Sequence, residues 1–196
     1  NTENDLNIAA GQQGVLRFNG EVDSLRVVRE MTFSADTYLI REKIRVVNTT
    51  DQARSVRVSY TVAADASNAA GDRYDAMRLA WDNDGSLGEE SSPKTLETTG
   101  SLVTGKIYWA GTMSTYFLAA VLPGDINNVT VKGRMQQNVF RAAVEEPEVM
   151  LGPGQERELT VSYWLGPKER AKLAAVSDQL SKSIDLGMFH VIAKGL

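Results

Sequence analysis

The sequence predicts a mostly β protein in which two antiparallel sheets pack face to face and one α-helix lies at the C-terminal end. Segments in which apolar and polar residues alternate follow one another along most of the chain, and no helical pattern separates them. This order favours antiparallel sheets over a parallel α/β sheet, whose strands are separated by helices. The only long helical pattern comes after the last of these segments.

The composition limits the classes of function. The chain has 196 residues, 42% of them hydrophobic, which is enough for one domain with a full core. Its net charge of −4 and the lack of a block of lysines and arginines argue against a nucleic-acid partner. Because the chain has no cysteine and one histidine, His190, it cannot form a zinc–cysteine site, a thiol nucleophile or a multi-histidine metal site by itself. We therefore expect no cofactor and no metal.

The first predicted strands are joined by short polar turns. The first strand ends at Asn19-Gly20, a pair that readily adopts the positive φ values of a tight hairpin turn. The clearest strand covers 37–48, where Glu42 is the one polar residue on an apolar face. A partner strand follows at 56–62, so the two form an antiparallel pair with one buried face.

No periodic pattern is present between residues 63 and 93, which predicts a long irregular loop. Within it, residues 82–85 (Asp-Asn-Asp-Gly) resemble part of a calcium-binding loop. The positions that should supply further acidic ligands hold Ala80 and Ser91 instead. We therefore favour a turn rich in aspartate and glycine.

The predicted strands resume after this loop and contain two of the three tryptophans. These strands cover 96–103, 107–109, 116–122, 129–132, 139–144 and 159–165. Trp109 and Trp164 lie inside strands and are expected in the core, whereas Trp81 lies in the long loop and is a candidate cleft aromatic for stacking a sugar ring.

An acidic run, Glu145, Glu146 and Glu148, could suggest the paired acid and base of a glycosidase. That chemistry needs one carboxyl group whose pKa is raised by burial, and nothing in the sequence indicates such burial. We therefore favour a solvated loop for this run.

The helical pattern at 167–183 begins with Pro167, whose fixed φ suits a first helical turn. Glu169 then places a negative charge in the first turn, where the helix dipole stabilises it. Its apolar stripe consists of Leu173, Val176, Leu180 and Ile184. This spacing places them on one face, which predicts that the helix docks on the sandwich. The expected organisation is a sandwich at 1–165, a helix at 166–184 and a lead-in to a membrane segment at 185–196.

Four groups of short motifs occur in order between Phe33 and Phe189. They are Phe33-Ser-Ala-Asp36-Thr-Tyr38 with Val46-Val-Asn48, Tyr108-Trp-Ala-Gly111 with the apolar run 116–123, Tyr163-Trp-Leu-Gly-Pro-Lys168, and Ile184-Asp-Leu-Gly-Met-Phe189. Together they resemble the large periplasmic domain of the bacterial membrane protein insertase YidC. The family pattern has a glycine where this chain has Tyr108, and the family domain begins with strands that have no counterpart before Val15.

The resemblance implies a twisted sandwich of the galactose-mutarotase type with the terminal helix packed on it. It also implies a transmembrane helix upstream of this chain and the insertase core after Leu196. On this basis we expect a non-catalytic module at the periplasmic face of the bacterial inner membrane that assists insertion and folding of membrane proteins. Its implied partners are the membrane core of the insertase, accessory subunits of the Sec translocon and substrate membrane proteins. Mutarotases need histidines that this chain lacks, so their activity is not expected here.

The apolar residues after the helix are expected to lead to the membrane interface. They are Leu186, Met188, Phe189, Val191 and Ile192. The alternative function, in a different class, is a carbohydrate- or peptide-binding sandwich whose ligand lies in a groove.

Overall fold

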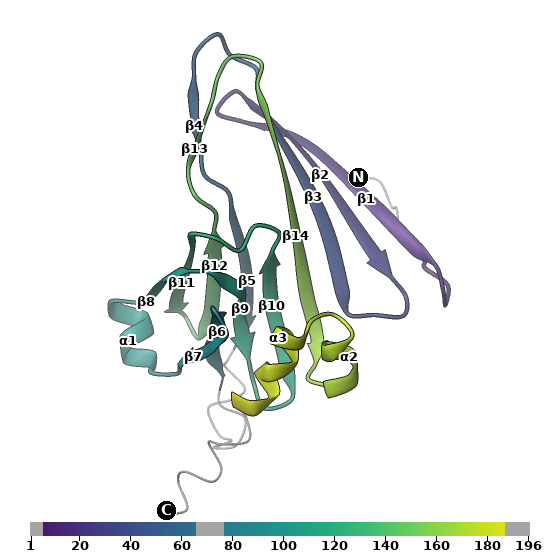
Figure 1. The fold of residues 1–196 in the computed structure, drawn as a ribbon, viewed down its shortest axis with the longest axis vertical. Helices are drawn as coiled ribbons and strands as arrows, with labels where there is room; N and C mark the ends of the chain where they lie inside the picture. Colours follow the sequence, from purple (N-terminus) through teal and green to yellow (C-terminus); the bar gives the residue numbers. More distant parts are fainter. Residues whose placement is uncertain (1–5, 66–76, 187–196) are drawn as a thin grey trace, which may run out of the picture.

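The computed structural model describes residues 6–65 and 77–186 and confirms a mostly β protein built from antiparallel sheets (Figure 1). The large sheet contains β1 (Gln13–Val22), β2 (Leu25–Ser34), β3 (Leu39–Asn48), β14 (Glu156–Pro167), β10 (Phe117–Pro123), β9 (Ile107–Met113), β6 (Arg78–Asn83) and β7 (Ser86–Glu90), in that spatial order. The smaller sheet contains β5 (Ser59–Asp65), β12 (Val139–Glu145), β11 (Val129–Gln136) and β8 (Ser101–Gly105). A separate two-stranded ribbon pairs β4 (Arg54–Val56) with β13 (Val149–Leu151).

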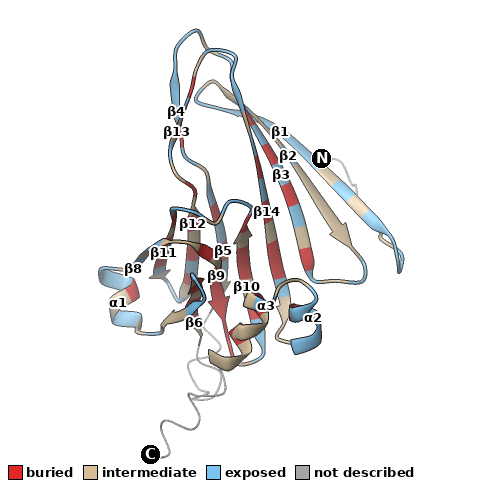
Figure 2. Ribbon diagram, in the orientation of Figure 1, coloured by how far each residue is buried: buried red, intermediate tan, exposed pale blue. Residues whose placement is uncertain are grey.

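The two main sheets pack on each other through a buried apolar core. Side chains from both sheets meet there, and the most deeply buried include Tyr60, Ile107, Val121, Val129 and Val144. Because the large sheet has eight strands and the small sheet four, the small sheet does not cover all of the large one. The strands β1, β2 and β3 extend away from the small sheet as a wing (Figure 1). In Figure 2 the outer part of this wing is largely exposed.

The first hairpin differs from the prediction. Asn19 and Gly20 pair with Val28 and Val27 inside the ladder, and the turn lies at Asp23-Ser24. Both turn residues have positive φ, 50° and 64°. Two successive positive φ values match the right-handed twist of the flanking strands, and aspartate tolerates this conformation better than most residues. The predicted Asn19-Gly20 turn is therefore wrong, and the observed turn lies four residues later.

The predicted long loop is also wrong, because β6 and β7 lie within it, and the strand predicted at 96–103 begins too early, because the helix α1 (Pro93–Thr98) covers its start and β8 begins only at Ser101. Leu79, Ala80 and Asp82 are all buried, so β6 faces neighbours on both sides and carries no alternating pattern. The hairpin turn between β6 and β7 lies at Asp84-Gly85, and Asp82 Oδ1 near the end of β6 accepts a 2.7 Å hydrogen bond from the backbone N–H of Gly85. The aspartate stabilises a turn, as the second interpretation of this stretch proposed.

The helical end of the chain is interrupted rather than continuous. The structure has α2 (Arg170–Ala174), α3 (Asp178–Ser181) and a 3-10 turn η2 (Lys182–Ile184). Pro167 does not begin a helix, because it is the last residue of β14 and pairs with Phe117. Ser177 is extended, and its hydroxyl accepts a 2.9 Å hydrogen bond from the N–H of Leu180, which caps α3. Serine side chains compete in this way with the helical backbone, so the single helix predicted at 167–183 breaks at Ser177.

Candidate functional site

The helical segment, by which we mean α2, α3 and η2 (170–184), covers the face of the large sheet opposite the small sheet. Neighbouring residues of the same strand belong to different clusters: Trp109 packs with the helical segment, whereas Ala110 packs between the sheets. Trp164 and Tyr163 divide in the same way on β14. The molecule therefore has three layers here, with the large sheet in the middle (Figure 1).

The helical segment is held by a compact apolar cluster. Leu173 of α2 and Leu180 of α3 are fully buried against Trp109 and Trp164, which are themselves fully buried. Val176, Ile184 and Leu186 are partly buried at the border of the same cluster. Thus all four residues of the predicted docking stripe lie on this cluster, although two short helices and not one long helix present them.

Polar contacts add direction to this apolar packing. The indole N–H of Trp109 donates a 3.0 Å hydrogen bond to the backbone carbonyl oxygen of Gln179 in α3. Arg78, which is buried at the start of β6, donates to the backbone carbonyl oxygen of Leu186 at 3.2 Å and pairs with Glu89 at 3.3 Å. Arg78 fixes the end of the described chain, and sequence reasoning missed it because no periodic pattern surrounds it.

The connection between β14 and α2 is tied to the turn between β9 and β10. The N–H of Lys168 donates to the carbonyl oxygen of Tyr116 at 2.7 Å, and its ammonium group lies 3.4 Å from the carbonyl oxygen of Ser114. Burial, and next the positive charge of Arg78, lower the pKa of Lys168 to about 8. The segment therefore leaves the sheet along a fixed path.

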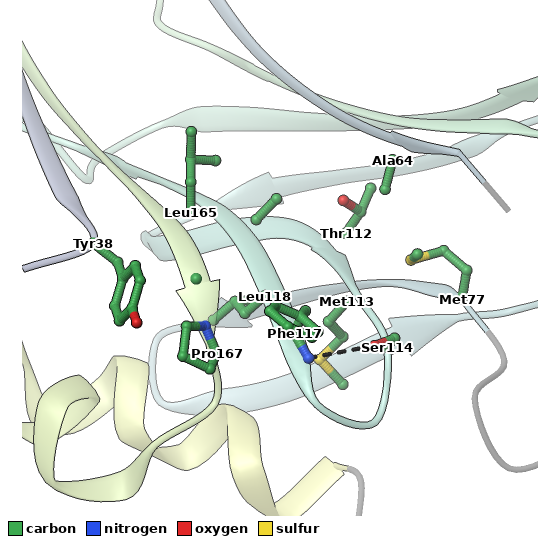
Figure 3. Close-up of a pocket in the computed structure, with 12 residues that line it drawn as sticks. Tyr38, Ala64, Met77, Thr112, Met113, Ser114, Phe117, Leu118, Leu165 and Pro167 are labelled. Atoms are coloured by element: carbon green, nitrogen blue, oxygen red, sulfur yellow. Dashed lines mark hydrogen bonds between the residues drawn. The ribbon is translucent and has the colours of Figure 1, made fainter.

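A shallow apolar pocket opens beside this connection (Figure 3). Its volume is about 420 Å³, and it lies between the end of β14, the β9–β10 turn and β5. Among its lining residues, Tyr38, Phe117 and Leu165 are exposed, whereas Met113 and Leu118 are buried. Its lining is suited to apolar groups and offers few polar partners.

A second groove lies between the wing and the small sheet, with a volume of about 480 Å³. Its walls are apolar side chains of β2 and β3, facing Val56 and Val58. Tyr60 and Tyr163 also line it, and each hydroxyl donates a 2.8 Å hydrogen bond to a buried glutamate, Glu146 and Glu42 respectively.

Both of these glutamates are neutralised by arginine. Glu42 pairs with Arg29, and Glu146 accepts a 2.7 Å hydrogen bond from Arg157. Each glutamate is only 2% exposed, so Glu146 does not lie in the solvated loop that we expected for the acidic run. Burial and the glutamate partners raise the pKa of both tyrosines, which keeps the hydroxyls protonated as donors. Carboxylates that already hold an arginine and a tyrosine form a structural network rather than a free acid and base.

The other two acidic residues of the run behave differently from Glu146. Glu148 is exposed and pairs with Arg57 at 3.1 Å, and it also accepts a hydrogen bond from Ser55, which lowers its pKa. Glu145 pairs with Lys132 at 2.7 Å. Burial of the middle residue follows from the aromatic and cationic partners supplied by Tyr60 and Arg157, which are distant in sequence and left no local signal.

The remaining candidates are placed as follows. Trp81 lies in β6 rather than in a loop, is half-buried, and lines neither of the two grooves described above. A Cβ atom on Gly88 would lie 2.4 Å from its indole ring, so the ring sits directly over that glycine of β7. Met188, Phe189, His190, Val191 and Ile192 lie outside the described residues. Within residues 6–65 and 77–186, no group of three or more acidic, histidine or cysteine side chains could hold a metal ion.

Solved structures with the same arrangement define the class of fold. A putative aldose 1-epimerase from Klebsiella pneumoniae is 11% identical, with a TM-score of 0.56, over 90% of this chain and 56% of that chain. A galactose mutarotase related enzyme from Lactobacillus acidophilus is also 11% identical, with a TM-score of 0.51, over 78% of this chain and 67% of that chain. The fold is therefore a galactose-mutarotase-like β-sandwich, and at this identity the likeness concerns the fold alone.

The family is narrower than the fold. The family model of the YidC periplasmic domain matches residues 1–196, and the chain belongs to this family. A membrane protein insertase YidC from Nitratidesulfovibrio vulgaris is 47% identical over 98% of this chain, and one from Maridesulfovibrio salexigens is 42% identical over 98%. The chain spans 35% of the length of these curated relatives. In the part of the chain that the structure describes, no helix is long and apolar enough to cross a membrane.

Proposed function

We propose that this chain is a non-catalytic connector module of a membrane protein insertase. It acts at the periplasmic face of the bacterial inner membrane and assists insertion and folding of membrane proteins. The observation that supports this role is the attachment of the helical segment to the large sheet through Leu173, Leu180 and the Trp109–Gln179 hydrogen bond. The attachment sets the direction in which the chain leaves the sandwich.

The physical basis is that the two helices cannot stand alone. With five and four residues, α2 and α3 are far below the roughly 12–15 residues at which an isolated helix becomes marginally stable. Full burial of Leu173 and Leu180 contributes about 1.5–3 kcal/mol each. The segment is therefore ordered by the sandwich, and its orientation depends on the docking contacts.

The proposal places the partners outside the sandwich core. The membrane core of the insertase is the first partner, and accessory subunits of the Sec translocon and substrate membrane proteins are further ones. Catalysis has no part in it, because Glu42 and Glu146 are occupied by arginine and tyrosine. The chain has one histidine in total.

A cell-based insertion assay with the full-length insertase tests the proposal. Leu180→Asp puts a charge in the docking cluster, and we expect it to lower insertion of a model membrane protein while the insertase itself remains in the membrane. Leu180→Ala is a milder variant and should give a smaller loss. Leu102→Asp serves as the control, because Leu102 is 69% exposed on β8. Protease sensitivity of the helical segment shows that Leu180→Asp has undocked it. If this undocked variant still inserts the model protein as efficiently as wild type, the connector role is ruled out.

A second function is favoured by the groove between the wing and the small sheet. Apolar side chains of the wing, Val22, Leu25 and Val27, face this groove and remain partly exposed. Such a surface beside the hydrogen-bonded Tyr60 and Tyr163 suits an extended peptide or a sugar chain. Calorimetric titration with oligosaccharides and with unfolded peptides tests this function, and Val27→Asp is the variant expected to abolish binding. The absence of any heat of binding at millimolar ligand concentration would count against this second function.

A further inference from the structure

Exposed large apolar side chains are not scattered evenly over the described residues. One group lies on the edge strand β1, and a second lies at the end of the molecule where β14 meets the helical segment. We call the second group the tip patch; it consists of Tyr38, Tyr116, Phe117 and Leu165. Contiguous exposed apolar groups of this kind mark interaction surfaces.

Backbone contacts join the members of the tip patch. The N–H of Leu165 donates to the carbonyl oxygen of Tyr38 at 3.1 Å. Phe117 pairs with Pro167 in the β10–β14 ladder, and Tyr116 accepts the hydrogen bond from Lys168. Figure 3 shows Tyr38, Phe117 and Leu165 among the residues that line the apolar pocket. The four residues therefore lie at one end of the large sheet, with the Tyr38 ring against Trp164 on the helical side and Phe117 and Leu165 on the other side.

Lysines border the tip patch. The ammonium group of Lys172 lies 5.0 Å from the centre of the Tyr38 ring, and Lys168 follows Pro167 directly. Glu169, the acidic residue between them, pairs with Lys172 at 3.0 Å. Lys168 is half-buried, with its ammonium group beside the carbonyl oxygen of Ser114, so Lys172 is the lysine that is exposed at the edge of the Tyr38 ring. Aromatic side chains with lysine at their edge are typical of the zone where lipid headgroups meet acyl chains.

We propose that the tip patch rests in the headgroup region of the lipid bilayer. The proposal rests on the proposed function, because that function places the module beside the membrane. Figure 1 places the β9–β10 turn, α2 and α3 at one end of the molecule, and the turns that connect β3 with β4 and β13 with β14 at the other. The described chain also ends near the first of these, where Arg78 holds the carbonyl of Leu186. The chain covers 35% of the length of a relative that is named as a membrane protein insertase.

The choice of lipid over a protein partner follows from the form of the patch. Tyr116 and Phe117 are 69% and 62% exposed and project from a tight turn, so they can enter a soft interface without a matching pocket. Lys172, at the edge of the Tyr38 ring, can reach phosphate groups while its alkyl stem lies along the ring.

Spin labelling of the full-length insertase tests the inference. Cysteines are introduced as Phe117→Cys and Tyr116→Cys, with native cysteines elsewhere replaced, and the protein is placed in vesicles of phosphatidylethanolamine with a minority of phosphatidylglycerol. Leu102→Cys and Met150→Cys are matched controls, because these residues are 69% and 63% exposed but lie on β8 and β13. We expect the labels at 116 and 117 to collide several-fold less with a water-soluble nickel chelate than the controls, and more with oxygen.

Two outcomes would overturn the inference. Labels at 116 and 117 that are as accessible to the chelate as the controls would place the tip in water. Protection from both the chelate and oxygen would place it against protein. The insertion assay tests the proposed function separately. Normal insertion by the Leu180→Asp variant would reject the connector role, whatever the spin labels report. Lipid contact at 117 together with normal insertion by Leu180→Asp would keep the inference and remove the connector role.

Discussion

The indole N–H of Trp109 on β9 donates a 3.0 Å hydrogen bond to the backbone carbonyl oxygen of Gln179 on α3, 70 residues further along the chain. Both tryptophans of this layer, Trp109 and Trp164, are fully buried beneath the helices. The contact combines apolar packing with a directed bond, so it fixes both the distance and the rotation of α3 relative to the sheet.

Replacing Trp109 with phenylalanine should lower the free energy of unfolding by about 2 kcal/mol. The substitution removes the donor to Gln179 and leaves a cavity where the larger ring was packed. Chemical denaturation of the 196-residue chain measures the change. Leu102→Ala is the control, and a change at this exposed site should stay within about 0.5 kcal/mol. Equal stability of the Trp109 variant and wild type would mean that the contact does not hold the helices.

Two neighbouring glutamates should differ strongly when each is replaced with alanine. Glu146→Ala removes the partner of the half-buried Arg157 and of the Tyr60 hydroxyl, and we expect a loss of about 3–5 kcal/mol. Glu148→Ala removes an exposed pair with Arg57, and we expect less than about 1 kcal/mol. Urea unfolding of the two variants under the same conditions measures both. Similar losses in the two variants would contradict the buried network described here.

Stability should rise with pH between about 8 and 10 because of Lys168. Its pKa falls from 10.5 to about 8 in the folded protein, so the unfolded chain binds more protons in this window. The cost of burying its charge is complete below pH 8 and is relieved as the pH increases. Lys168→Met removes the group, so the difference in unfolding free energy between this variant and wild type should shrink over the window. The window ends near pH 10, where tyrosines of the unfolded chain begin to ionise. A difference that stays constant from pH 7 to 10 would show that Lys168 does not titrate in this way.

Gly111→Ala should destabilise the large sheet by about 1–3 kcal/mol. A Cβ atom at this position would lie 2.0 Å from the carbonyl oxygen of Ala119 on β10, and backbone atoms cannot move aside as a flexible side chain can. Thermal unfolding of the variant tests this expectation. Gly20→Ala is the control, since a Cβ there meets nothing within 4 Å. The close approach also gives a physical reason for the glycine in the motif that begins at Tyr108.

The sequence predicted the parts of the fold in which one face is buried and the other is exposed. The alternation at 37–48 corresponds to β3, and the core positions of Trp109 and Trp164 are confirmed by their full burial. Alternation disappears where both faces are covered, which is why β6 was predicted as a loop. Pairing partners distant in sequence decide such strands, and a single sequence does not display them.

The errors at the candidate site have local or long-range causes. The helical spacing of Leu173 and Leu180 predicted the stripe. It did not predict the break at Ser177, because the break depends on a hydrogen bond from the N–H of Leu180 to the Ser177 hydroxyl, which apolar spacing does not reveal. Burial of Glu146 depends on Tyr60 and Arg157, 86 and 11 residues away. The sequence did not predict the tip patch, because Tyr38 and Tyr116 come to the same end of the sheet only when β14 lies between β3 and β10.

The position of β14 has a consequence for the order of events during synthesis. This strand is the last of the described strands in sequence, yet it lies between β3 and β10 and joins β1-β2-β3 to β10-β9-β6-β7. Until residue 167 has emerged, the two halves of the sheet have no shared partner and their inner edges remain open. Closure therefore waits for the synthesis of β14, and any factor that shields exposed strand edges must act while residues 13–155 are already made and β14 is not.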